Sequence, residues 1–185
     1  MGTDKAFVPL LGMPMIEHVL QRVDGLGREI TIITNRLGDY AYLGLPTFED
    51  VYLDHGPLGG IHSALKNAKY PHTLIVACDM PWLNRPFLEH MIEIRNSADI
   101  IVPRWGKYPE PLHAVYSQVC SGPIEANLRE KRLKIVSFFG SVNVDYLDRD
   151  VIKRYDPEGR SFVNVNTPAD LAVANRQMRS DSGPK

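Results

Sequence analysis

The chain has 185 residues, of which 44% are hydrophobic and 23% are charged, and its formal net charge at pH 7 is -1. This length is enough for one domain with a sizeable core and is short for two. The near-neutral charge and the lack of a basic cluster argue against a nucleic-acid partner, and no apolar run approaches the roughly 20 residues that span a membrane.

The first residues and the two cysteines indicate a cytoplasmic protein. Met1 to Lys5 lack the apolar core of a signal peptide. Cys78 and Cys120 form neither a CxxC pair nor a disulfide framework, which is typical of a reducing compartment. We therefore expect one domain over residues 1–179 and a frayed, disordered tail over residues 180–185.

The first half of the chain alternates predicted helices and strands. Apolar residues at helical spacing behind Pro14 predict a helix over residues 16–23. The β-branched run 29–34 predicts a strand that ends at Asn35, and residues 46–50 are typical of a short second strand. A Gly-rich segment then opens a helix whose apolar positions share one face, namely Leu58, Ile61, Leu65 and Ala68.

The stretch from His72 to Pro81 predicts a buried parallel strand that ends in a single carboxylate, Asp79. Pro81 disfavours helical backbone at Met80, so the chain turns just after the acid. Ligands of open α/β sheets bind at the carboxyl edge of the strands. We therefore expect Asp79 at the rim of a ligand site.

The second half of the chain continues the alternation of helices and strands. We expect, in order, a helix from Pro86, a strand over 98–103, a loop over 105–111 that carries Glu110, extended structure over 112–116, a helix over 123–130, a last strand over 161–166 and a terminal helix from Thr167. This order predicts a single-domain α/β fold, with a mostly parallel sheet and helices on both faces.

Polar side chains fall at or just after the ends of predicted strands, at Asn35, Asp54, Asp79, Asn164 and Asn166. Strand ends that converge on one edge can place such groups around a single ligand. Each of them alone also fits a turn residue or a helix cap. Their shared placement favours a binding site.

Three features suit phosphate and metal chemistry. The segment Gly56, Pro57, Leu58, Gly59 and Gly60 lets backbone approach a ligand at a helix N-terminus, which favours an anion, although glycine and proline also simply interrupt loops. Asp79 suits Mg²⁺, or it caps the next turn. Lys5 offers a charge to phosphate, or it is merely solvated. No HExxH, GxSxG or GxGxxG pattern supports a histidine metal site, a hydrolase triad or a dehydrogenase.

A set of motifs in order along nearly the whole chain resembles the molybdenum cofactor guanylyltransferases of the MobA type. These motifs are Met1-Gly2-x-Asp4-Lys5-Ala6, Gly12-x-Pro14-x-Ile16, Gly56-Pro57-Leu58-Gly59-Gly60-Ile61, Cys78-Asp79-Met80-Pro81, Glu110-Pro111-Leu112 and Asn164-Val165-Asn166-Thr167-Pro168-x-Asp170-Leu171. The first and third also occur in nucleotidyltransferases that act on sugars or isoprenoid alcohols. The last three favour the molybdopterin branch.

The resemblance implies a Rossmann-like nucleotidyltransferase fold that joins GMP from GTP to molybdopterin, with Mg²⁺, and releases pyrophosphate. It implies that Lys5 contacts nucleotide phosphate, that Asp79 holds Mg²⁺ and that both are catalytic. It also implies that Asn35, Asp54 and the segment from Gly56 to Gly60 bind GTP. Glu110, Asn164 and Asn166 would face the pterin.

The resemblance leaves other readings open. These are a cytidylyltransferase for the same cofactor, a sugar or isoprenoid nucleotidyltransferase, and a catalytically inactive molybdopterin-binding relative. An enzyme of this kind would also contact insertion chaperones or apo-molybdoenzymes transiently.

The N-terminus departs from the family pattern. Family members begin with a hydrophobic strand and a Gly-rich stretch of the form LAGGxSxRMGxDK, and this chain starts at the methionine within that motif. That strand would lie inside the sheet, and the loop would supply backbone donors to the triphosphate. We expect the chain as written to bind GTP poorly and an upstream-extended version to bind GTP and transfer GMP.

Overall fold

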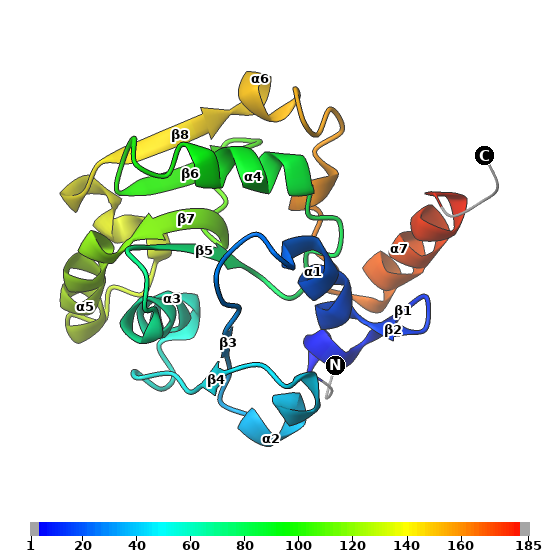
Figure 1. The fold of residues 1–185 in the computed structure, drawn as a ribbon, viewed down its shortest axis with the longest axis horizontal. Helices are drawn as coiled ribbons and strands as arrows, with labels where there is room; N and C mark the ends of the chain where they lie inside the picture. The colour runs from blue at the N-terminus through cyan, green and yellow to red at the C-terminus, as the bar shows by residue number, and fades with distance from the viewer. Residues whose placement is uncertain (1–3, 182–185) are drawn as a thin grey trace.

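A computed structural model describes residues 4–181 and shows a mixed sheet with helices on both of its faces (Figure 1). The described strands form a four-stranded sheet and two short two-stranded ladders. In chain order they are β1 (Pro9–Leu10), β2 (Met13–Pro14), β3 (Ile32–Ile33), β4 (Thr47–Phe48), β5 (His72–Val76), β6 (Ile100–Arg104), β7 (His113–Ser117) and β8 (Val144–Asp148).

The four-stranded sheet has the order β5-β7-β6-β8. β7 is antiparallel to both of its neighbours, whereas β6 and β8 are parallel. Three of the four strands, β5, β6 and β8, therefore run in one direction, and β7 alone opposes them. The sheet is therefore mixed rather than mostly parallel, and of the strands expected to carry the site residues only β5 belongs to it. β1 and β2 form an antiparallel hairpin, and β3 and β4 pair in parallel.

The α-helices are α1 (Met15–Val23), α2 (Leu37–Tyr40), α3 (Gly56–Asn67), α4 (Arg85–Glu93), α5 (Ser121–Arg129), α6 (Arg149–Ile152) and α7 (Pro168–Asp181). Most of the α-helices lie around this sheet, whereas α2 lies beside β4 and α7 beside the hairpin of β1 and β2 (Figure 1). Short 3-10 helices connect several of them, including η1 (Lys5–Phe7) and η5 (Arg160–Phe162).

Two apolar clusters lie on opposite faces of the sheet because successive strand side chains alternate in direction. Ile100 and Val102 of β6 join a cluster with α3 and α5. Ile101, between them, packs with residues of α1, α4 and α6. The prediction of helices on both faces is therefore confirmed.

β3 and β4 are not joined by a ladder to the four-stranded sheet in the part of the chain that the structure describes. α3 contacts both β3 and β5, and it lies against both sheets. A further apolar cluster brings Ala6 of η1, Ile32 of β3 and Tyr40 of α2 together, with Cys78 packed against them. The elements near the N-terminus therefore pack against the segment that follows β5.

Several features of the predicted secondary structure need correction. The expected buried parallel strand that ends in Asp79 is instead β5, which ends at Val76, is half-buried and pairs antiparallel with β7. The expected strand 161–166 is wrong: Ser161 and Phe162 end η5, and residues 163–166 have no regular structure. Strand β8 was not predicted, because Leu147 is its only buried side chain and its sequence lacks an apolar run. Of the tail expected at 180–185, Ser180 and Asp181 belong to α7, and residues 182–185 lie outside the described residues.

Within residues 4–181, none of the helices combines the length and the apolar character that crossing a bilayer requires.

Candidate functional site

Asp79 lies where the chain leaves β5, beside two other segments. The N–H of Ala77 donates to the Leu112 carbonyl at 2.9 Å, and the N–H of Val165 donates to the Asp79 carbonyl at 3.0 Å. Val76 pairs with His113 at the start of β7. The position predicted for Asp79, at the carboxyl edge of the sheet, is therefore the one that it occupies.

The environment of Asp79 favours a nearby cation. Burial raises the pKa of its carboxyl, and the Lys5 ammonium and a backbone N–H lower that pKa without fully offsetting the effect. Burial also raises the pKa of the neighbouring Cys78 to about 11, so its thiol stays protonated at neutral pH. A protonated thiol is a poor nucleophile, so Asp79 rather than Cys78 is the candidate functional group at this edge.

Lys5 reaches this edge from the N-terminal end of the chain. Its Nζ donates to Oδ1 of Asn166 at 2.5 Å. The N–H groups of Asn166 and Thr167 both donate to Oδ2 of Asp170, at 3.0 and 2.8 Å, and the Asp170 N–H donates to Oγ1 of Thr167 at 3.1 Å. This reciprocal cap fixes the start of α7 and the backbone from which Asn166 reaches Lys5.

A second polar group lies at the ends of β3 and β4. Asn35 and Asp50 bond reciprocally: Nδ2 of Asn35 donates to Oδ2 of Asp50 at 3.0 Å, and the Asp50 N–H donates to Oδ1 of Asn35 at 2.9 Å. Oδ1 of Asp50 is buried without a hydrogen-bond partner among the described residues. A Cβ on Gly60 would lie 3.8 Å from that oxygen, so this carboxylate is adjacent to the first turns of α3.

Sequence reasoning missed Asp50 and selected Asp54. Asp54 is exposed on the turn before α3, with φ +60°. Asp50 is the last residue of the predicted strand 46–50, as Asn35 is the residue at which the predicted strand 29–34 ends, and this is the signal that could have identified it. An orphaned buried carboxylate oxygen marks Asp50 as a candidate ligand group.

The Gly-rich segment forms the first turns of α3, with Pro57 among its first residues. A Cβ on Gly59 would meet the Tyr52 carbonyl oxygen at 3.1 Å, so the helix start packs closely against the preceding loop. The side chain of Leu58 is fully buried in the core. Gly56, with φ +58°, and Gly60 complete the segment. This segment can therefore offer a ligand its backbone, including the N–H groups at the start of α3.

The residues expected on the pterin side lie on two segments that contact the end of β5 or the turn after it. Glu110 is half-buried in the loop between β6 and β7, and burial raises the pKa of its carboxyl. The Glu110 carbonyl accepts from the His113 N–H at 3.0 Å, at the strand that pairs with β5. Within residues 4–181, Oδ1 of Asn164 is buried without a partner, one residue before the Val165 N–H that bonds to Asp79.

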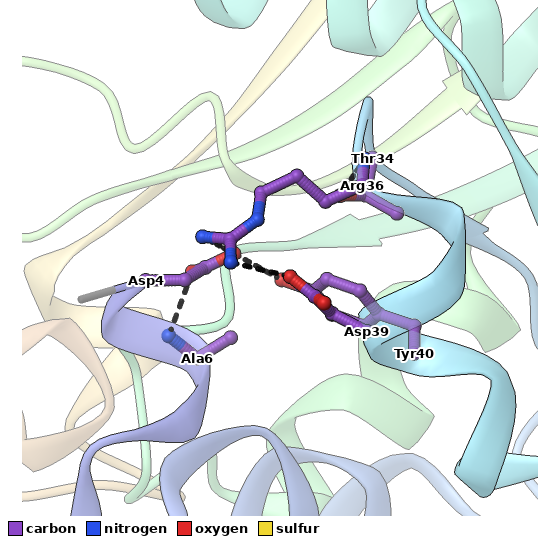
Figure 2. Close-up of polar contacts among 6 residues, drawn as sticks. All are labelled: Asp4, Ala6, Thr34, Arg36, Asp39 and Tyr40. Atoms are coloured by element: carbon purple, nitrogen blue, oxygen red, sulfur yellow. Dashed lines mark hydrogen bonds and ion pairs between the residues drawn. The ribbon is translucent and has the colours of Figure 1, made fainter.

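Asp4 joins the Lys5 segment to α2 (Figure 2). Its Oδ2 accepts from the Tyr40 hydroxyl at 2.9 Å and lies 3.9 Å from Nη1 of Arg36. Cys78 packs against the apolar cluster that contains Tyr40, so α2 lies near the segment that carries Asp79. The group of Lys5 and Asp79 and the group of Asn35 and Asp50 therefore both border the apolar cluster that contains Tyr40.

Among residues 4–181, no three His, Cys, Asp or Glu side chains are grouped so as to hold a metal ion by themselves. Mg²⁺ does not require such a set, since it uses hard oxygen ligands and commonly takes one or two carboxylates together with substrate phosphates. The desolvated carboxylate of Asp79 and the orphaned Oδ1 of Asn164 are oxygen donors of this kind. The residues present fit Mg²⁺ held jointly with a nucleotide.

Comparison of the sequence with known proteins identifies one family. Residues 1–141 match the MobA-like NTP transferase domain. A protein of Pelotomaculum thermopropionicum, named a probable molybdenum cofactor guanylyltransferase, is 35% identical over 182 residues, covering 98% of this chain and 88% of the relative. A protein of Vibrio parahaemolyticus, named molybdenum cofactor guanylyltransferase, is 32% identical over 174 residues, covering 92% and 86%.

Comparison of the fold gives a consistent result. The molybdopterin-guanine dinucleotide biosynthesis protein A of Archaeoglobus fulgidus superimposes with a TM-score of 0.85 at 27% identity, covering 97% of this chain and 92% of the other. The 2-C-methyl-D-erythritol 4-phosphate cytidylyltransferase of Thermus thermophilus has a TM-score of 0.71 at 16% identity, covering 95% and 94%. The second likeness concerns the nucleotidyltransferase fold alone.

Proposed function

Because the chain belongs to the family of MobA-like NTP transferase domains, we propose that it transfers GMP from GTP to the terminal phosphate of molybdopterin. The observation that carries this proposal is the meeting of Lys5, Asp79 and Asn166 at the carboxyl end of β5. A cation, a carboxylate and an amide at one sheet edge are suited to binding a metal-bound polyphosphate.

The reaction is an in-line displacement at the α-phosphorus of GTP. An oxygen of the molybdopterin phosphate forms the new bond to phosphorus. The bond from this phosphorus to the bridging oxygen of the β-phosphate breaks, and its electron pair leaves with pyrophosphate. The attacking phosphate is already ionised at neutral pH, so the step needs positioning and charge neutralisation rather than a covalent nucleophile or a dedicated base.

Each group at the edge of β5 has a distinct part in this step. The Lys5 ammonium would bind the phosphates of GTP, and Asn166 would hold its Nζ in place from the cap of α7. Asp79 and Asn164 would hold Mg²⁺, which supplies charge neutralisation on the phosphates when it is bound. Burial of the Asp79 carboxyl strengthens its attraction for the cation because water screens the charges less.

The Asn35 and Asp50 pair supports guanine as the base. The Watson–Crick edge of guanine presents a ring N–H and an amino group, and both are donors. A carboxylate is purely an acceptor, and Oδ1 of Asp50 is a buried acceptor without a partner in the described part of the chain. Asn35 would keep this carboxylate oriented through their two mutual hydrogen bonds. Cytosine offers fewer donors to such a group, which favours GTP over CTP.

The pterin would bind on the side of Glu110, Asn164 and Asn166, which lie on the loop before β7 and on the segment that bonds to the Asp79 carbonyl. Glu110 is a half-buried carboxyl, and carboxyl and amide groups pair well with the donors and acceptors of a pterin ring. Asn166 would then connect the two substrates, since it also holds Lys5, which would bind the GTP phosphates. This arrangement would bring the attacking phosphate close to the α-phosphorus.

We also place the enzyme in the cytoplasm, with transient contacts to insertion chaperones or apo-molybdoenzymes that receive the product. Both cysteines are free thiols, which suits a reducing compartment.

The test is a transfer assay with GTP, molybdopterin and Mg²⁺, followed by mass spectrometry of the dinucleotide and by detection of pyrophosphate. The assay is run on the 185-residue chain and on a fusion that places a family member's strand and Gly-rich loop before Met1. We expect the guanine dinucleotide from GTP and little product from CTP. No transfer by either form, or a preference for CTP, would overturn the proposal.

Two test variants and one control variant accompany this assay. Lys5→Ala and Asp79→Asn should each abolish most of the transfer, because each removes a charge that acts on the phosphates. Lys69→Ala removes an exposed lysine whose partner is Glu29, on the surface, and it should leave transfer unchanged.

A further inference from the structure

Asp4 directly precedes Lys5 and makes contacts in two directions (Figure 2). Its Oδ1 accepts from the Ala6 N–H at 3.1 Å and caps η1, the 3-10 helix that begins with Lys5. Its Oδ2 accepts from the Tyr40 hydroxyl at 2.9 Å and lies 3.9 Å from Nη1 of Arg36. A single carboxylate therefore joins the turn that carries Lys5 to α2.

The partner of Asp4 is held rigidly. Tyr40 is only 5% exposed, and its ring lies 4.7 Å from that of Phe7, at the other end of η1. Burial and the adjacent Asp4 raise the pKa of the Tyr40 hydroxyl, so it remains a donor at all physiological pH values. The ring packing and the hydrogen bond together fix η1 against α2 at both ends of η1.

α2 in turn follows the strand that ends at Asn35. The N–H of Arg36 donates to Oγ1 of Thr34 at 3.2 Å, which fixes the turn from β3 into α2. The contact between Asp4 and Tyr40 therefore connects the phosphate-binding residue to the strand end that carries the proposed base-binding residue. The two residues are 36 positions apart in the sequence, so local structure alone does not impose this contact.

We propose that Asp4 and Tyr40 form a positioning link that sets the place of Lys5 relative to Asn35 and Asp50, and hence the distance between the phosphate and base subsites for GTP. This inference rests on the proposed function. Neither side chain need touch the nucleotide, since both Asp4 oxygens already accept hydrogen bonds and the Tyr40 ring is buried. Both act through Lys5 and α2.

Arg36 belongs to the same link. Its Nη2 lies 2.5 Å from Oδ2 of Asp39, and its Nη1 faces Asp4. Two carboxylates neutralise this guanidinium and hold it across α2. Arg36 therefore braces the link and is a poor candidate for a second phosphate ligand.

The decisive variant is Tyr40→Phe, which removes one hydroxyl and keeps the ring packing and every charge. The matched control is Tyr42→Phe, which removes the exposed hydroxyl that donates to Glu17 at 3.1 Å. The first readout needs no ligand: protein with ¹³C-labelled lysine gives a side-chain signal for Lys5, assigned with Lys5→Arg. We expect this signal to shift or broaden in Tyr40→Phe and to stay unchanged in Tyr42→Phe. An unchanged Lys5 signal in Tyr40→Phe would overturn the link.

The second readout is a double-mutant cycle on the Kd for GTP with Mg²⁺, using the same two protein forms as the transfer assay. Tyr40→Phe should raise Kd about tenfold in the parent and less than about twofold in a Lys5→Ala background, because its effect passes through Lys5. A loss that persists in the Lys5→Ala background would show general destabilisation and overturn the positioning role.

The two readouts separate the two proposals. If the Lys5 signal shifts in Tyr40→Phe but neither protein form binds GTP, the shift supports the structural link. The absence of GTP binding then overturns the proposed function and the nucleotide role of the link. GTP binding that is unaffected by Tyr40→Phe supports the proposed function and overturns the link.

Discussion

Gly159 lies against the ring of Trp105, and replacing it with alanine should destabilise the protein strongly. A Cβ at this position would lie 2.1, 2.4 and 2.6 Å from Cε2, Cζ2 and Nε1 of Trp105. Gly159 also has φ +68°, a conformation that alanine adopts with strain. The substitution therefore combines a backbone cost with displacement of a large ring.

The magnitude follows from these two terms. The left-handed backbone costs a non-glycine residue about 1–2 kcal/mol, and overpacking costs about 1–3 kcal/mol. Trp105 has little freedom to retreat, since its ring stacks on Phe162 at 5.9 Å and carries the Arg149 guanidinium at 4.6 Å. We expect Gly159→Ala to lower the free energy of unfolding by about 2–5 kcal/mol.

The assay is urea denaturation of Gly159→Ala beside Gly44→Ala. Gly44 has φ +65°, and a Cβ at this position would meet no atom of the described residues within 4 Å. Its substitution therefore measures the backbone term alone, about 1–2 kcal/mol. In a Trp105→Ala background the excess cost of Gly159→Ala should disappear. Equal destabilisation by the two glycine substitutions would refute the packing argument.

Three further predictions concern pH dependence, a helix cap and base selection. Burial lowers the pKa of His113 to about 4, so the unfolded chain takes up this proton first as pH falls. The free energy of unfolding should therefore decrease between pH 6.5 and 4 by up to about 3 kcal/mol. Urea titrations of His113→Leu over this pH range should lack this decrease, and a pH dependence of the unfolding free energy equal to that of the parent would contradict the prediction. Thr167→Ala removes the acceptor for the Asp170 N–H and should cost about 1 kcal/mol in thermal unfolding, whereas Thr167→Ser should cost much less. Asp50→Asn should raise the Kd for GTP about tenfold and improve binding of xanthosine triphosphate, because an amide can donate to the 2-oxo group; calorimetry that finds both affinities unchanged would exclude Asp50 from base recognition.

The sequence was most informative where one local pattern determines structure. The apolar spacing in α1, α3 and α4 predicted each helix on the face that it buries. The run that ends at Asp79 predicted a strand near this acid, and β5 forms there. It ends at Val76, however, its side chains are half-buried, and it pairs antiparallel with β7 rather than as a buried parallel strand. The family and the nucleotidyltransferase fold are confirmed by the comparisons.

The sequence was least informative where contacts join distant segments. β8 forms because Val144 and its neighbours pair with β6, and nothing in its own residues requires this. The run 161–166 contains β-branched residues, yet it lies at the end of η5, where Ser161 donates from its backbone N–H to buried Asp156. Tyr40 is identified only by its partner, Asp4, and the hydrogen bonds of Asp50 with Asn35 distinguish it from the other acids near the end of its strand.

The contact of Lys5 with Asn166 has a consequence for biosynthesis. These residues are 161 positions apart, and both meet the segment after β5 from opposite ends of the chain. Lys5 is synthesised long before Asn166, so their hydrogen bond cannot form until the start of α7 has left the ribosome. The central sheet can therefore fold before Lys5 and Asn166 meet, so that a nascent chain arrested ahead of Asn166 would be largely folded but would lack this contact beside Asp79.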